Sequence, residues 1–392
     1  ILITKIFIIE RELKVFFSVD ALDRALELAA RYIYGKALLG KAIDLLTEAA
    51  YIVRQRKGAG SRVSEEDIVE LVALKTKIPL GQVRETEKEK LLQLEELIHQ
   101  SLINQEEAVK AVGNALRRSR LQLRGKKKTI CNFLFVGPTG VGKTELAKTL
   151  ARVYFGDEKR MVRLDMSEYQ EKRSMRRLIG LRTEEEVNRG YLTEAIKRQP
   201  YSLLLLDEIE KAHSDILNLF LQVMDDGRLT DASGETINFT NVILIATSNS
   251  GTQFVQQKIK QSVSYDEIYR ELKERILLEN FKPEFLNRFD KITLFRALSV
   301  GNMTAITNLF LDAVKEKLKE KGVELEVEEL AVKELAMRGF DPLYGARPLK
   351  RVIQDKVESA LARLFLEDKI KRRDRVILKE GLVFKVEKAR EI

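Results

Sequence analysis

The chain has 392 residues, of which 44% are hydrophobic and 33% are charged, and it carries a formal net charge of +9. This length accommodates two or three domains with separate cores, and the composition excludes a disordered or fibrous protein. No apolar run approaches the roughly 20 residues that cross a bilayer, which argues against a membrane protein. One cysteine and two histidines exclude an internal disulfide and a dedicated zinc site, and favour a reducing compartment such as the cytoplasm.

The N-terminal part is predicted to be helical. Apolar residues recur at helical spacing over residues 19–53, with interruptions expected at Gly35 and Gly40. A flexible connection is expected next, and then a helix that Ser64 caps with Asp67 near the reciprocal capping position.

Two charged amphipathic helices, over 85–100 and 106–123, lead into the densest basic cluster of the chain. That cluster consists of Arg117, Arg118, Arg120, Arg124, Lys126, Lys127 and Lys128. A nucleic-acid patch is one interpretation. A solvated helix end is favoured, because no aromatic side chains alternate with these charges as a stacking platform would require.

From residue 130 onward, short apolar runs alternate with helical stretches. The runs are 130–136, 161–164, 203–206, 242–246 and 292–295. This alternation predicts an α/β fold, with a parallel sheet flanked by helices on both faces.

Beyond residue 298 the chain is predicted to form a smaller, mostly helical lid domain. A short strand is expected at 324–327, and a terminal hairpin at 375–378 and 383–386. Turn signals within the α/β part predict another small hairpin over 228–239.

A glycine-rich turn between the first predicted strand and the following helix fits the phosphate-binding pattern G-x-x-x-x-G-K-[ST]. Glycines let backbone N–H groups turn toward phosphate oxygens, and the helix N-terminus favours negative charge. The lysine reaches the β- and γ-phosphates, and the threonine hydroxyl is a Mg²⁺ ligand. The predicted ATP-binding residues here are Gly137, Pro138, Thr139, Gly140, Val141, Gly142, Lys143, Thr144 and Glu145.

Two carboxylates follow the leucine run 203–206. Ligands of open α/β sheets bind beyond the carboxyl ends of the strands, so Asp207 and Glu208 are expected to face the triphosphate. Asp207 is assigned, with Thr144, to Mg²⁺, and Glu208 to the attacking water. Asn249 follows the next strand, where it fits either a γ-phosphate contact or a plain turn.

Several blocks in this order resemble the second ATPase module of the Hsp100/Clp family of AAA+ proteins. They are GPTGVGKTELAKTLA, LLLLDEIEKAH, LFLQVMDDGRLTD, TSNSG, FKPEFLNRFD and GARPLKRVI. Upstream, RYIYGKALLGKAIDLLTEAA resembles the small helical domain that closes the first module. The resemblance implies the end of one module joined to a complete second one, as in a fragment of a longer two-module protein.

The resemblance also implies roles for single residues. Asn249 is the γ-phosphate sensor, Arg288 the arginine finger lent to a neighbouring subunit, and Arg347 the sensor of the lid. Leu102 and Ile103 line the adenine pocket, in a segment where Asn104 replaces the usual glycine.

The sequence departs from the family pattern at three places. Residues 181–190 are charged where the family has an aromatic substrate-gripping loop, and Tyr191 is the next aromatic side chain. Residues 250–266 lack the tripeptide that docks a ClpP-like peptidase, so such docking is not expected. Glu235 stands where a basic residue is common.

The resulting hypothesis is a Mg²⁺-dependent AAA+ ATPase that forms a homo-oligomeric ring, a hexamer, and remodels, unfolds or disaggregates protein substrates. An ATP-gated scaffold that threads nothing is the first alternative, and a nucleic-acid-dependent ATPase the second. The expected domains are a helical remnant of a first module (1–62), connecting helices (63–100), a nucleotide-binding domain (101–297) and a C-terminal lid (298–392).

Overall fold

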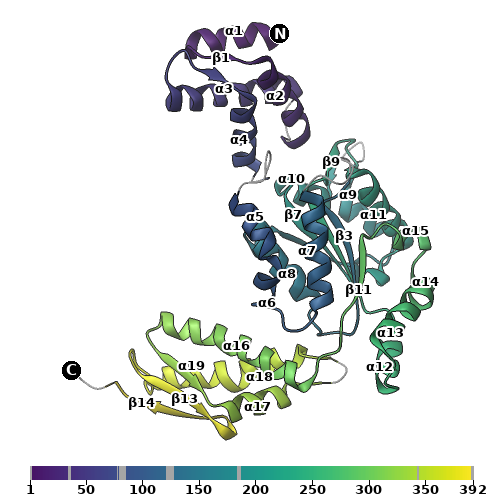
Figure 1. Cartoon of the computed structure of the whole chain (residues 1–392), viewed down its shortest axis with the longest axis vertical. Coiled ribbons are helices and arrows are strands. Elements are labelled where there is room, and N and C mark those ends of the chain that lie inside the picture. Colours follow the sequence, from purple (N-terminus) through teal and green to yellow (C-terminus); the bar gives the residue numbers. More distant parts are fainter. Residues whose placement is uncertain are drawn as a thin grey trace.

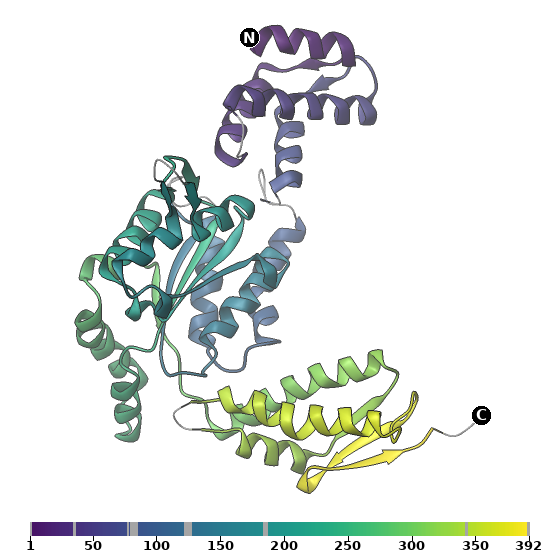
Figure 2. The same cartoon turned by 180° about the vertical axis from the view of Figure 1, so that it is seen from behind.

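In a computed structural model of the chain, three bodies follow one another along the molecule (Figure 1). The structure describes residues 2–33, 37–76, 78, 85–120, 128–182, 187–341 and 344–389. Helices of the N-terminal part lie at one end, an α/β body lies in the middle, and a smaller body of helices and strands lies at the other end (Figures 1 and 2).

Four helices and a two-residue strand pair build the N-terminal body around one hydrophobic cluster. The reciprocal cap predicted for its last helix is confirmed: Ser64 N–H donates to Asp67 Oδ2 at 2.9 Å, and Asp67 N–H donates to Ser64 Oγ at 3.4 Å. The elements are α1 (Leu2–Leu13), β1 (Phe16–Phe17), α2 (Val19–Tyr32), α3 (Leu38–Lys57), β2 (Arg62–Val63) and α4 (Glu65–Thr76).

Two expectations for this body were wrong. Gly40 does not interrupt a helix but lies in the first turn of α3, where an added Cβ would meet nothing within 4 Å. The helix also continues through Lys57, into the expected flexible connection, because Ala49, Ala50 and Val53 keep its buried stripe in register. Gly35 lies outside the described residues.

The segment before the sheet forms three helices. The helix predicted over 85–100 is divided at Gln93 into α5 (Glu85–Leu92) and α6 (Leu94–His99). The next helix, α7 (Glu106–Arg120), is confirmed as far as the described residues reach. Figure 1 shows α7 and α8 (Lys143–Phe155) lying against the central sheet.

The central sheet has five parallel strands in the order β11-β3-β10-β7-β4, which confirms the predicted fold class. Every residue of β3, β7 and β10 is buried, as expected of strands covered on both faces. The strands are β3 (Cys131–Val136), β4 (Met161–Asp165), β7 (Ser202–Asp207), β10 (Val242–Ser248) and β11 (Lys291–Leu294).

Alternate residues of each strand pack into different cores. Leu203 and Leu205 join α6, α7 and α8 on one face, whereas Leu204 and Leu206 join α10 and α11 on the other. The elements around this second face are α9 (Met175–Ile179), β5 (Gly180–Arg182), β6 (Val187–Arg189), α10 (Tyr191–Arg198), α11 (Ser214–Asp226), β8 (Arg228–Thr230), β9 (Thr236–Asn238), α12 (Thr252–Lys260), α13 (Tyr265–Glu271), a π-helical turn (Leu272–Ile276), α14 (Leu277–Asn280) and α15 (Pro283–Leu286). The predicted hairpin over 228–239 is confirmed as β8 and β9.

The C-terminal body has its own hydrophobic cluster. Its three-stranded sheet, in the order β12-β13-β14, confirms the predicted short strand and terminal hairpin. The elements are α16 (Val300–Glu320), β12 (Glu324–Val327), α17 (Glu329–Arg338), α18 (Arg347–Ile353), a π-helical turn (Gln354–Glu358), α19 (Ser359–Leu366), β13 (Arg375–Lys379) and β14 (Val383–Glu387). Among all described residues, no helix is both long and apolar enough to cross a membrane.

Candidate active site

The glycine-rich turn lies between the end of β3 and the start of α8. Gly137, Gly140 and Gly142 have φ values of 147°, 75° and 107°, a region that residues with a Cβ seldom adopt. At Gly140 an added Cβ would lie 2.0 Å from the backbone oxygen of Tyr344, so the turn also touches the lid. The glycines therefore serve both the backbone conformation and this close approach.

Lys143, the first residue of α8, is buried. Its Nζ donates to the backbone oxygens of Gly137 and Pro138 and, at 2.9 Å, to Asn249 Oδ1. Burial lowers the pKa of Lys143 to about 8, against the opposing effect of the nearby carboxylates of Glu210, Asp207 and Glu208. The ammonium group is thus held where phosphate oxygens would replace carbonyl oxygens as its partners. Thr144 is half-buried behind it, and Glu145 is exposed in the same first turn.

Asp207 is the last residue of β7 and Glu208 follows it, but the two acids have different surroundings. Asp207 is buried, accepts a hydrogen bond from the Thr247 hydroxyl, and pairs with the Arg163 guanidinium at 2.6 Å. Glu208 has the left-handed φ of 56° and a carboxylate only 2.7 Å from Lys211 Nζ. Its side chain is 34% exposed, so water can reach it. One acid is fixed and the other is accessible.

Asn249 follows β10 and lies against both the turn and the acids. Its Oδ1 accepts hydrogen bonds from Lys143 Nζ and from the Thr139 hydroxyl at 3.5 Å. Its backbone N–H donates to Glu210 Oε1 at 3.0 Å. The other oxygen of Glu210 is buried and has no hydrogen-bond partner among the described residues. The structure thus brings Asn249 to the phosphate-binding turn.

Leu102, in the segment before α7, approaches the turn, and Ile103 next to it is half-buried. Leu102 is buried, and its Cδ1 would lie 2.9 Å from a Cβ added at Gly142. Asn104 adopts φ = 64°, in the left-handed region that glycine enters without strain. Asparagine enters this region more readily than most residues, so it can replace the usual glycine of the family here.

Arg347 begins α18, and its backbone nitrogen would lie 3.2 Å from a Cβ added at Gly140. Next to it, Ala346 N–H donates to the Gly140 carbonyl at 3.2 Å. The lid therefore reaches the phosphate-binding turn at the place where the sequence puts its sensor arginine, and the Arg347 side chain is exposed there.

Arg288 is the one predicted site residue that the fold places elsewhere. Its carbonyl accepts a hydrogen bond from the Asn132 side chain, at the amino end of β3. The turn starts five residues later, at Gly137, about 16 Å away at the usual rise per strand residue. Arg288 Nε lies 2.8 Å from Asp225 Oδ2, in ionic contact without hydrogen-bond geometry, and its side chain is 37% exposed.

The structure describes part of the segment 181–190, which stands where the family has an aromatic loop. Residues 180–182 and 187–189 form the antiparallel pair β5 and β6, and 183–186 lie outside the described residues. Tyr191 is the first residue of α10 and is 56% exposed. Glu235, the third departure, lies 2.8 Å from Lys197 Nζ, which also contacts Glu194 and Asp231.

Comparison with known families divides the chain in the same order. Residues 8–112 match a model described as "AAA lid domain", 128–292 match "AAA domain (Cdc48 subfamily)", and 298–378 match "C-terminal, D2-small domain, of ClpB protein". A Meiothermus ruber protein named "Chaperone protein ClpB" is 46% identical over 360 residues, covering 90% of this chain and 42% of the relative.

The chain belongs to the ClpB/Hsp104 family of AAA+ ATPases. It corresponds to the second ATPase module of that family, preceded by a lid segment.

Other ClpB/Hsp104 proteins are also similar to most of the chain. The Aquifex aeolicus ClpB chaperone is 47% identical over 320 residues, with 79% of this chain and 31% of the relative covered. The solved "S. cerevisiae Hsp104:casein complex, Extended Conformation" has a TM-score of 0.83 at 35% identity, with 97% of this chain and 66% of that one covered. The chain spans about two fifths of the length of the Meiothermus ruber relative.

The structure also reveals site residues that the sequence reading missed. Arg163 and Thr247 hold Asp207, and Glu210 holds the Asn249 backbone. Arg163 lies in β4 and Thr247 in β10, the two strands that flank β7. Knowledge of the strand order would have pointed to Arg163 and Thr247, but no local sequence pattern marks them.

Proposed function

We propose that the chain is a Mg²⁺-dependent ATPase module that assembles into a ring and remodels protein substrates. The observation that carries this proposal is the convergence, at the carboxyl edge of one parallel sheet, of Lys143, Asn249 and the Asp207–Glu208 pair. Such groups bind a triphosphate, sense its last phosphate and activate a water molecule.

The donor set fits magnesium better than a softer metal. Asp207 and Thr144 offer a carboxylate and a hydroxyl, the hard oxygen ligands that Mg²⁺ combines with water and substrate phosphates. Consistent with this, the described residues contain no cluster of three or more His, Cys, Asp or Glu side chains that would hold a metal without a nucleotide. When bound, Mg²⁺ neutralises charge that develops on the phosphate oxygens.

Each residue then has a distinct part. Lys143 binds the β- and γ-phosphates, Glu208 orients and deprotonates the attacking water, and Asn249 contacts the γ-phosphate. Leu102, which contacts Gly142, and the adjacent Ile103 cover the adenine.

The two arginines act from outside this group. Arg288 serves the active site of a neighbouring subunit, a role that its place at the opposite end of β3 supports, because it cannot reach its own phosphate turn. Arg347 couples the nucleotide to the position of the lid, supported by the contact of Ala346 with Gly140.

The proposals of ring assembly and of protein substrates are based on the similar proteins. Two solved structures of similar fold are described as Hsp104 bound to casein. We extend this to a homo-oligomer, a hexamer, that acts on unfolded or aggregated protein. The charged segment around 182–189 keeps the non-threading scaffold as the alternative, since no aromatic side chain occurs there.

The domain division and the cellular location are part of the same proposal. Separate hydrophobic clusters support a division into an N-terminal helical part (1–62), connecting helices (63–100), a nucleotide-binding domain (101–297) and a lid (298–392), although α4 packs in the N-terminal cluster. A cytoplasmic location is favoured by the single, buried cysteine, Cys131.

The test measures the ATPase rate per chain against protein concentration, with and without casein as an unfolded substrate. A ring predicts a rate that rises with concentration, and a remodeller predicts further stimulation by casein. Hydrolysis unaffected by casein would favour the scaffold, and stimulation by DNA that high salt abolishes would favour the nucleic-acid alternative. Failure to bind ATP would refute the proposal.

A further inference from the structure

The segment that joins the sheet to the lid is held by the large domain at Phe295 and Arg296. Phe295 N–H donates to the Val136 carbonyl at 2.7 Å, which extends β11 by one bond beyond its end. The Arg296 guanidinium lies 4.4 Å from the centre of the Tyr265 ring and 2.5 Å from Glu107. Ser299 is the N-cap of the lid helix α16, and Leu298 is already buried in the hydrophobic cluster of the lid, so Ala297 forms the link.

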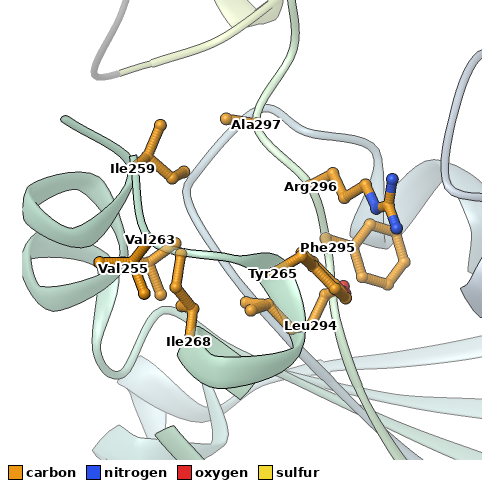
Figure 3. A pocket seen from close by; sticks show the side chains of 9 residues that line it. All are labelled: Val255, Ile259, Val263, Tyr265, Ile268, Leu294, Phe295, Arg296 and Ala297. Atoms are coloured by element: carbon orange, nitrogen blue, oxygen red, sulfur yellow. The ribbon is translucent and has the colours of Figure 1, made fainter. Parts of the chain in front are cut away.

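An apolar cavity of about 230 Å³ lies beside this segment. Figure 3 shows Leu294, Phe295 and Arg296 on one side of it and Val255, Val263 and Ile259 on the other. On the cavity side, the Tyr265 hydroxyl donates to the Leu294 carbonyl, and the Tyr265 ring contacts the Arg296 guanidinium. Hydrogen bonds to the backbone of Arg296 come from the opposite flank.

One side chain supplies those bonds. Gln105 is 2% exposed, and its Nε2 donates to the Arg296 carbonyl at 2.9 Å while its Oε1 accepts from Arg296 N–H at 2.9 Å. The same Nε2 donates to the Val141 carbonyl, within the phosphate-binding turn, at 3.2 Å. A single buried amide thus joins the turn that receives phosphate to the last anchored residue before the lid.

The backbone of this residue is unusual as well. Gln105 has φ = 73°, directly after Asn104 at 64°. Two consecutive non-glycine residues in the left-handed region cost energy and persist only where surrounding contacts fix them. Asn104 adds a 3.4 Å hydrogen bond to Asn302, in the first turn of the lid helix α16.

We infer that Gln105 is a positioning residue that transmits the state of the phosphate-binding turn to the hinge of the lid. When the Val141 carbonyl moves, it changes the hydrogen bond that it accepts from Gln105 Nε2, which also donates to the Arg296 carbonyl. The lid then pivots on the link that follows Arg296. This inference rests on the proposed ATPase function and adds to it the route by which nucleotide sets the angle of the lid.

The test uses the whole chain with two introduced spin labels. Arg152→Cys is placed at an exposed position of α8 and Met337→Cys on α17, where Met337 is 65% exposed. The native Cys131 is buried and stays unlabelled. Pulsed electron spin resonance gives the distance between the labels without nucleotide, with ADP and with ATPγS. The variant is Gln105→Met, which keeps the side-chain length but makes none of the three hydrogen bonds. The matched control is Gln100→Met, at an exposed glutamine that caps α6.

We expect three results for Gln105→Met. The distance distribution broadens even without nucleotide, the shift between ADP and ATPγS disappears, and kcat falls about tenfold while ATP affinity falls less than about threefold. Gln100→Met behaves as the parent chain. A purely structural role would weaken binding and turnover together and would leave the lid response intact.

The opposite outcomes are equally clear. The inference is overturned if Gln105→Met keeps both the distance shift between ADP and ATPγS and the nucleotide-free distance distribution of the parent chain. If that variant does not fold, Gln105→Glu replaces it, since a carboxylate accepts from Arg296 N–H but cannot donate to either carbonyl. If the parent chain binds no nucleotide, the proposed function fails, and the nucleotide-free distribution still decides whether Gln105 holds the hinge.

Discussion

Asp207 at the end of β7 and the next residue, Glu208, show how neighbouring residues acquire different surroundings. Asp207 is held on both oxygens, by Thr247 and Arg163, whereas Glu208 is partly exposed and contacts the amine of Lys211. A carboxylate fixed in this way suits a metal ion with its water shell, and an accessible one suits a water molecule that must lose a proton.

Replacing Glu208 by Gln should leave ATP binding intact and lower kcat by about 10²–10⁴-fold, because the amide cannot accept the proton of the attacking water. Equilibrium binding of a fluorescent ATP analogue and steady-state hydrolysis together check this. Undiminished turnover would remove Glu208 from the reaction.

Replacing Thr247 by Val removes the hydroxyl that donates to Asp207 and accepts from Glu208 N–H at 3.2 Å, with little change in volume. Loss of such a supporting group typically costs about 10–100-fold in metal affinity or activity. We expect a raised Mg²⁺ requirement in a titration of hydrolysis against magnesium. Thr230→Val, on the exposed edge of β8, is the control and should titrate as the parent chain.

At the scale of the elements, ion pairs connect a helix of the large domain to a neighbouring hairpin. Lys197 of α10 contacts Glu194 in its own helix and Asp231 and Glu235 of the β8–β9 hairpin. The departure from the family pattern at Glu235 therefore has a structural reason: an acid here pairs with Lys197. The three carboxylates raise the pKa of Lys197 despite its burial.

Glu235→Arg should accordingly destabilise the hairpin rather than the sheet. The Glu235 carboxylate is 43% exposed, so the free energy of unfolding should fall by no more than about 1 kcal/mol. Amide hydrogen exchange should quicken in β8 and β9 and stay unchanged in β3. Uniform quickening would contradict a local role.

Glu95 and Arg117 join α6 to α7 with two hydrogen bonds and are both less than one-third exposed. The hydrogen bond from Arg117 lowers the pKa of Glu95 in the folded chain. The resulting stability is therefore fully present above the unfolded-state value near 4.3 and is lost as pH falls through the lower folded value. Glu95→Gln should cost about 1 kcal/mol at pH 7 and progressively less in urea unfolding below pH 4. A cost independent of pH would show that the charge is immaterial.

At the scale of the whole molecule, Arg288 and the phosphate-binding turn lie at opposite ends of one strand. Arg288 lies at the amino end of β3, and the turn lies at the carboxyl end. In the proposed ring, a chain in isolation would therefore lack the cation that neutralises the transition state.

Arg288→Ala should lower hydrolysis by about 10³-fold or more while leaving ATP affinity nearly unchanged, since an arginine supplied in trans is worth about 10³–10⁵ in rate. Mixing Arg288→Ala chains with Glu208→Gln chains should restore activity, because some interfaces then combine an intact finger with an intact acid. Activity of a dilute monomer equal to that at high concentration would contradict action in trans.

The amino-acid sequence was sufficient to predict the features that depend on residues close together along the chain. Alternating apolar runs, the spacing of Gly137 to Thr144 and the acids after residues 203–206 predicted the α/β fold and the phosphate-binding turn, because each feature is a local backbone pattern. The same logic failed at Gly40, where helix packing outweighed the low helix propensity of one glycine. Helix α1 was also missed, although Ile6, Ile9 and Leu13 are buried in it.

The partners of the site residues depended instead on how distant segments pack. Arg163 meets Asp207 because β4 and β7 are adjacent, and Gln105 meets Arg296 across 191 positions of sequence. The separation of Arg288 from its own turn follows from the length and direction of β3. No short pattern records these relations, since each arises from the strand order and from the packing of side chains that only the folded chain brings together.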